Sequence, residues 1–131
     1  DVIRRQRQMC IRDRLYRICK NNSIVDIRVP HPRHDDFISD PTHVRPITIL
    51  CLQLYDKSLN ERWEKMNAAN TPLALIHGVN FNIKDVKYVL EDNYIKLLES
   101  KEIDQNELQE YIKKYNNVVK EMKIKWVALK D

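Results

Sequence analysis

The sequence predicts a small mixed α/β domain, dominated by helix, with two or three short strands followed by a C-terminal antiparallel helical hairpin. Three observations support this fold class. Apolar residues alternate with charged ones over Val25–Val29, which is the two-residue period of a half-buried strand. Two segments near the C-terminus carry apolar residues at helical spacing, and each begins with a capping residue. A chain with one glycine, Gly78, is poorly suited to a β-rich fold with many tight turns. An all-α fold is the alternative.

The first strand is predicted to lead into a long loop. Asn21-Asn22-Ser23 is a turn signal, and the alternating pattern at Val25–Val29 ends at Pro30. Residues 30–46 contain four prolines, three histidines and three aspartates. Because proline removes backbone donors and fixes its own φ angle, this composition indicates an irregular segment.

The middle of the chain contains two short apolar runs. The run Ile47–Leu54 fits a fully buried parallel strand, and a helix opened by Pro46 is the alternative. Ser58 and Glu61 form a capping box, which predicts a helix over about 59–69. The second run, over 73–77, precedes the Gly78 turn and is a further candidate strand.

The predicted hairpin occupies the C-terminal third. Asn82 is expected to cap a helix over about 83–99, and Asp104 to cap the last helix. A loop at 100–103 would make the two helices antiparallel neighbours. Apolar residues of the last helix follow the heptad spacing of a coiled-coil seam: Leu108, Ile112, Tyr115, Val119, Met122, Trp126 and Leu129.

The end of this last helix is the predicted interaction site. Tyr111 and Val118 add a second apolar stripe beside the seam, which one partner helix would not cover. The preceding helix is too short to reach Trp126 and Leu129, so these two side chains are expected to form an exposed apolar tip. We therefore expect these four residues to contact another chain.

Residues 1–14, DVIRRQRQMCIRDR, differ in character from the rest of the sequence. They resemble the conceptual translation of sequencing-adapter read-through, as found in truncated metagenomic reading frames, and are interpreted as a non-native segment with few buried contacts. They hold five arginines and two aspartates, so +3 of the +4 net charge lies here and residues 15–131 carry +1. Residues 15–131 are expected to form one small domain, whole or part of a longer protein.

Composition excludes several classes of protein. One glycine excludes phosphate-binding loops that need several. Three cysteines without a CxxC spacing indicate reduced thiols and a cytoplasmic location. No apolar run approaches the roughly 18 residues of a membrane span, so no membrane partner is expected.

Two groups of residues could carry chemistry. His31, His34, Asp35 and Asp36 are candidate ligands of a divalent metal, the one cofactor considered; the alternative is a solvated loop. The pair His34-Asp35 resembles that of HD-type phosphohydrolases, but its proline-rich context departs from their helical pattern. The second group would gather at the ends of parallel strands: Asp56, Lys57, Ser58, His77 and Asn80.

The leading functional interpretation is a non-enzymatic protein interaction or assembly module that uses the helical hairpin, with a protein partner or a homo-oligomer. The first alternative is a small metal-dependent hydrolase, or a fragment of one, that uses the loop from His31 to Asp36 together with Asp56. The second alternative is a nucleic-acid-binding module, which is disfavoured once residues 1–14 are discounted. It would use Arg17, Lys20, Arg28, Arg33 and Arg45.

Overall fold

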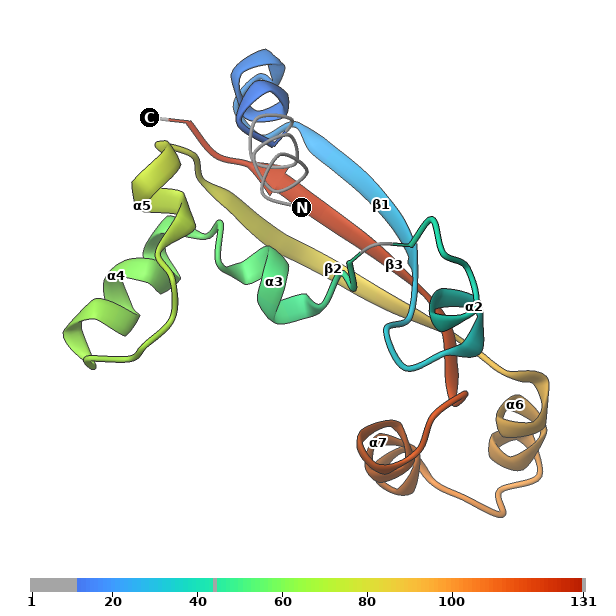
Figure 1. Cartoon of the computed structure of the whole chain (residues 1–131). Coiled ribbons are helices and arrows are strands. Elements are labelled where there is room, and N and C mark those ends of the chain that lie inside the picture. Colours follow the sequence, from blue (N-terminus) through green and yellow to red (C-terminus); the bar gives the residue numbers. More distant parts are fainter. Residues whose placement is uncertain (1–11, 44, 131) are drawn as a thin grey trace. The chain divides into compact units, whose positions relative to one another are not determined.

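The computed structural model describes residues 12–43 and 45–130 (Figure 1). A helical segment at 12–18 precedes the labelled elements. In chain order these are β1 (Ile24–Pro30), α2 (Asp35–Ile38), α3 (Ile49–Gln53), α4 (Lys57–Lys65), α5 (Leu73–His77), β2 (Phe81–Leu90), α6 (Asp92–Glu99), α7 (Gln105–Lys114) and β3 (Val119–Ala128).

The strands form a three-stranded antiparallel sheet in the order β1-β3-β2. At one end of the β1–β3 pair, the amide of Asn22 donates to the carbonyl of Ala128, and at the other end His31 donates to Lys120. Residue numbers therefore rise along β1 as they fall along β3. The same holds for β2 and β3, where Glu91 donates to Val118. The C-terminal strand is thus the central strand, and the two others are its edges.

The chain divides into two compact units, and the division falls within each strand. Unit 1 comprises residues 1–26, 49–85 and 125–131, and unit 2 comprises residues 27–48 and 86–124.

The core of unit 1 is built on Trp126 of β3, which is 2% exposed. Its ring stacks on Phe81, with centroids 3.9 Å apart, and meets the ring of Tyr55 edge-on at 5.8 Å. Phe81 in turn contacts Tyr16 edge-on at 5.3 Å. These aromatic rings bring a β3 residue, the start of β2 and the segment after α3 into one apolar cluster.

A buried asparagine joins two helices of unit 1. Asn60 on α4 is 1% exposed, and its Nδ2 donates to the carbonyl of Leu54 at 3.1 Å. Its Oδ1 accepts from the amide of Ala74 at 3.0 Å and from that of Leu75 at 3.4 Å. The amides of Ala74 and Leu75 lie in the first turn of α5, where helix donors lack intrahelical partners. Asn60 thereby caps α5 through space.

The core of unit 2 lies around α6 and α7. Ile103, Leu108 and Val118 are buried and form one cluster. Half-buried side chains pack against this cluster: Leu90, Tyr94, Leu97, Leu98, Tyr111 and Ile112. Asp104 caps α7 as expected, because its side chain accepts from the amide of Glu107 at 2.7 Å.

The predicted C-terminal helical hairpin is wrong. The last helix ends at Lys114, and residues 119–128 form β3. Asn117 has a φ of 61°, a left-handed conformation that a helix cannot contain. Beyond it, Met122, Ile124, Trp126 and Ala128 are buried while Lys123 and Lys125 are exposed, which is the two-residue period of a strand.

Three further expectations about elements are wrong. The run Ile47–Leu54 contains the helix α3 instead of a strand, as its alternative proposed. The run 73–77 is the helix α5, which ends at Gly78 in the left-handed conformation. The helix expected over 83–99 is only half present. Residues up to Leu90 form the strand β2, and the helix α6 begins at Asp92. The strand expected at Val25–Val29 is present as β1.

Residues 12–14 of the N-terminal segment belong to the helical segment at 12–18, and residues 1–11 lie outside the described residues. The guanidinium of Arg12 donates to the hydroxyl of buried Tyr55 at 2.6 Å and lies 4.9 Å from the ring centroid. The expectation of few buried contacts for residues 1–14 stays a prediction, because only three of these residues are described. None of the described helices combines the length and apolar character that a bilayer span requires.

Candidate functional site

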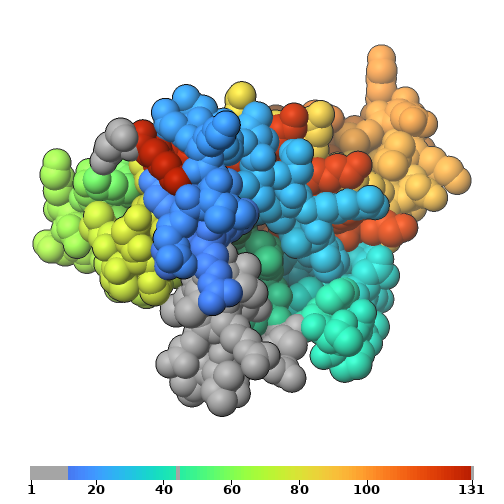
Figure 2. Space-filling view, turned by 90° about the horizontal axis from the view of Figure 1, so that it is seen from above, coloured from blue at the N-terminus to red at the C-terminus, as the bar shows by residue number. Residues whose placement is uncertain are grey.

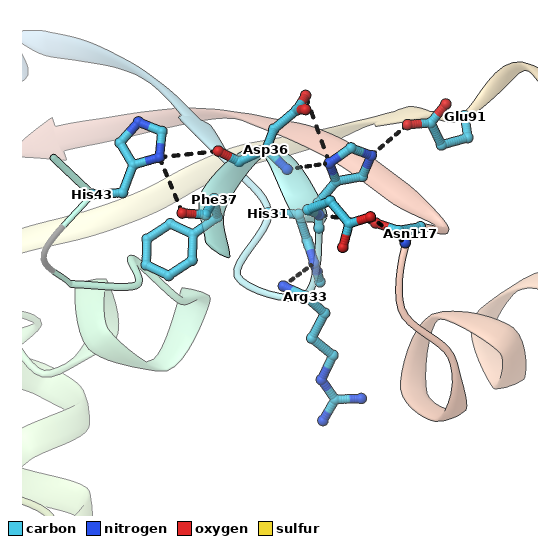
Figure 3. A network of polar contacts seen from close by, with 9 residues as sticks. His31, Arg33, Asp36, Phe37, His43, Glu91 and Asn117 are labelled. Carbon is cyan, nitrogen blue, oxygen red and sulfur yellow. Dashed lines mark hydrogen bonds and ion pairs between the residues drawn. The ribbon is translucent and has the colours of Figure 1, made fainter. Parts of the chain in front are cut away.

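The loop that holds the candidate metal ligands is organised by hydrogen bonds (Figure 3). His34 is 5% exposed and caps α2, because its Nδ1 accepts from the amide of Asp36 at 3.0 Å. Since Nδ1 is an acceptor, the proton of the neutral ring lies on Nε2, which donates to the carboxylate of Glu91. Both ring nitrogens of His34 are therefore engaged within the chain.

Asn117 ties the same loop to the segment that joins α7 and β3. Its amide donates to the carbonyl of Arg33 at 3.0 Å. Its Oδ1 accepts from the amide of Asp35 at 2.9 Å, and its Nδ2 donates to the carboxylate of that residue at 3.2 Å. Arg33 also donates to the carbonyl of Lys113. The left-handed turn that ends the predicted long helix is thus the point to which the loop attaches.

The remaining histidines of the loop also have intramolecular contacts. His31 Nδ1 accepts from the amide of Arg33 at 3.1 Å. Burial lowers the pKa of His31 from its ordinary value of 6.5, and the charges of Arg33 and His34 act in the same direction. His43 stacks on Phe37, with ring centroids 5.7 Å apart (Figure 3).

These geometries make the loop from His31 to Asp36 a structural connection within unit 2. In the part of the chain that the structure describes, no group of three or more His, Cys, Asp or Glu side chains is placed to hold a metal ion. The structure brings His34 and Asp36 together and turns Asp35 towards Asn117. Metal binding by this loop stays a prediction.

The second predicted group is partly assembled in unit 1, by helices instead of parallel strands. The amide of Lys57 donates to the side chain of Asn80 at 3.1 Å. Asp56 caps α4 by accepting from Leu59 and also accepts from the hydroxyl of Ser58 at 2.8 Å. Half-buried His77 closes α5.

A pocket of about 260 Å³ lies beside the Lys57–Asn80 contact. Its walls include Tyr16, Leu75 and Val79. The volume falls below the range of about 300–1,000 Å³ typical of small-molecule sites. Among the described residues, the polar groups beside this pocket act mainly as helix caps, so we assign no chemical function to the pocket.

The expected apolar tip of Trp126 and Leu129 is not exposed, and Tyr111 and Val118 of the flanking stripe are also half-buried or buried. Trp126 is buried in the core of unit 1, and Val118, at 1% exposure, is buried in that of unit 2. Tyr111 packs on the cluster around α7, and Leu129 is half-buried and donates its amide to the carbonyl of Asn80. The expected exposure of Trp126 is wrong because this residue lies in β3, the central strand of the sheet, and not at the protruding end of a helix. A role in binding another chain stays a prediction for these residues.

The basic residues of the nucleic-acid hypothesis are divided among local contacts. Arg17 lies 3.7 Å from the carboxylate of Asp13, and Arg28 pairs with Glu121 on the neighbouring strand. This pairing lowers the pKa of Glu121. Arg33 donates to a backbone carbonyl as described above, Lys20 is exposed, and Arg45 also has a partner. Nucleic-acid binding stays a prediction.

The edge strand β2 is the feature that sequence reasoning missed. Its ten residues contain no proline, and Lys84, Asp85, Lys87 and Tyr88 are exposed. Among the described residues, Lys84, Asp85 and Lys87 form no ion pair. Val86, Tyr88 and Leu90 follow the two-residue period of a strand, whereas Val86, Leu90, Tyr94 and Leu97 follow the helical spacing that predicts a helix over 83–99.

Comparison with known proteins gives no family for this chain. It matches no protein-family model, and no curated protein or solved structure is significantly similar to it. Its function is therefore argued from its own geometry.

Proposed function

We propose that this protein is a non-enzymatic protein-interaction module that binds an extended segment at the open edge of β2. The observation that carries the proposal is the position of β2, which has β3 on one side and no further strand on the other among the described residues. This replaces the helical hairpin as the interacting element, because the hairpin is absent.

An open edge strand presents backbone amide and carbonyl groups to any chain that can add a strand. At the start of β2, the amide of Phe81 donates to the carbonyl of Tyr55, so this end is already contacted. Between Ile83 and Leu90, the backbone of β2 makes no hydrogen bond to the backbone of a described loop. These eight residues exceed the five to six of an ordinary strand, so the available edge is long enough for strand addition.

The other edge is less suited to strand addition. β1 has seven residues and ends at Pro30, which lacks an amide donor. Of its two charged residues, Arg28 already pairs with Glu121 on the central strand, which leaves only Asp26. Figure 2 shows β1, in light blue, at the molecular surface, so exposure alone does not distinguish the two edges. Length, composition and unpaired charge favour β2.

Peptide selection with hydrogen exchange tests this proposal. A random peptide library displayed on phage is selected against the full chain, and the amide exchange of the protein is measured with the selected peptides. We expect slower exchange within residues 83–90 and little change in β1. Selected peptides that protect other segments and leave 83–90 unchanged would refute strand addition at β2. For a chain that is monomeric under the selection conditions, failure to select any peptide would refute it as well.

A further inference from the structure

We infer that the extended segment bound at β2 is β2 of a second copy, paired antiparallel about a two-fold axis at Val86. This inference rests on the proposed function and names its partner. It is carried by the order of the charges along β2, where Asp85 and Lys87 flank Val86.

Opposite charges face each other in this register. When Val86 lies opposite Val86 of the second copy, residues at equal distances before and after it are paired. Asp85 then lies opposite Lys87 of the second copy, and the symmetry repeats the pair. Directly opposite residues in an antiparallel pair have Cβ atoms about 4.5–5.5 Å apart, which is close enough for an ion pair.

The neighbouring positions are also compatible in this register. Lys84 lies opposite Tyr88 of the second copy, an arrangement that suits a cation–π contact. Ile83 lies opposite Val89 of the second copy, so two half-buried apolar side chains meet. No position along the central part of the strand places like charges opposite each other.

Neighbouring registers lack this complementarity. A two-fold axis at Asp85 would place two aspartates opposite each other, and an axis at Lys87 would do the same with two lysines. A two-fold axis midway between two residues would pair odd-numbered positions with even-numbered ones. Each side chain that faces the core in one copy would then lie beside a side chain that faces solvent in the other. Among these registers, only the axis at Val86 matches the charges and keeps the faces of the two sheets aligned.

The pairing would not disrupt the single chain. Lys84, Asp85 and Lys87 are exposed, and in the described part of the chain none of them has an ion-pair partner to lose. Lysines and aspartates on a lone edge strand normally discourage pairing with other strands. The order of these charges along β2 disfavours pairing with most other strands but is complementary to β2 of a second copy.

Charge reversal tests the register. Sedimentation equilibrium is measured for the wild type, Asp85→Lys, Lys87→Asp and an equimolar mixture of the two variants. Each variant alone converts two attractive pairs into two repulsive ones, so we expect its dimer dissociation constant to rise roughly ten- to thirty-fold. The mixture restores attraction at both positions, since one chain then carries lysine at both positions and the other chain carries aspartate at both. It should associate as strongly as the wild type.

Lys96→Glu, which reverses an exposed charge on α6, is the matched control and should leave dimerisation unchanged. Thermal melts of all variants establish that each chain is folded. A wild-type dimer that neither charge reversal weakens would overturn the register. A wild-type chain that stays monomeric while selected peptides protect residues 83–90 would overturn the second copy as partner and leave the proposed function standing. A monomer that no peptide protects there would overturn both.

Discussion

Replacing Trp126 by alanine should destabilise the protein strongly without acting through association. The side chain is 2% exposed, stacks on Phe81 and meets Tyr55 edge-on. Removing it deletes the largest fully buried side chain of the described residues and both aromatic contacts.

The size of the effect follows from these contacts. Truncating a buried Trp to Ala costs about 3–5 kcal/mol in lost transfer free energy and cavity formation. The expected cost for Trp126 lies towards the upper end of that range because two aromatic contacts, with Phe81 and Tyr55, are also lost. Each aromatic pair contributes about 0.5–1.5 kcal/mol beyond its buried area. One opposing contribution exists: the buried Nε1–H of Trp126 has no hydrogen-bond partner among the described residues. Its removal relieves a penalty of about 1 kcal/mol. We expect a net loss of about 4 kcal/mol.

The assay is urea denaturation followed by far-ultraviolet circular dichroism. Trp126→Phe is the matched control, since phenylalanine keeps a ring against Phe81 and lacks the unpaired N–H. Its loss should be about 1–2 kcal/mol, clearly smaller than that of alanine. A loss below about 1.5 kcal/mol for Trp126→Ala would contradict its burial in the core. An undiminished melting temperature combined with weaker self-association would instead support the exposed tip expected from the sequence.

Three further predictions concern polar groups. Asn60→Ala should lower the free energy of unfolding by about 1–2 kcal/mol in urea denaturation, because three side-chain hydrogen bonds are lost while the amide of Ala74 still donates to the carbonyl of Leu54; a loss within the error of the assay would count against the through-space cap. A double-mutant cycle of His34→Ala and Glu91→Ala should give a coupling free energy of at least about 0.5 kcal/mol, whereas additive losses would show that the pair does not hold the loop. The lowered pKa of Glu121 stabilises the folded state above its ordinary pKa of 4.5, and this contribution is lost as the pH falls through the lower folded value. Arg28→Gln should therefore flatten this part of the pH–stability curve, and an unchanged acid limb in thermal melts would refute the assignment.

Local signals in the sequence were sufficient where one short-range interaction decides the backbone. Asp104 caps a helix because its side chain reaches the amide of Glu107 three residues later. Gly78 adopts a positive φ because it lacks a Cβ atom. β1 has the alternating pattern of its segment.

The central strand shows why local signals failed elsewhere. Residues 108–129 satisfy a heptad pattern, and Met122, Ile124 and Trp126 also satisfy a two-residue period, so spacing alone does not choose between helix and strand. The pair Asn116-Asn117 carries the same turn signal as Asn21-Asn22, and Asn22 and Asn117 both have positive φ angles. Giving that signal equal weight at both places would have ended the helix correctly.

The candidate site depended on long-range pairing in the same way. No spacing rule connects His34 to Glu91, or the loop at 33–35 to Asn117, since these residues are far apart in sequence. Nor could the sequence identify β2 as an edge, because an edge is defined by the strand that is missing beside it. By itself the sequence determined the Asp104 cap, the glycine turn and the first strand, each set by neighbouring residues. The expected caps at Ser58 and Asn82 are wrong, since Asp56 caps α4 and Asn82 lies in β2. Tertiary structure decided β2, β3 and the open edge, because strands form only when backbone groups from distant segments can pair and bury a common face.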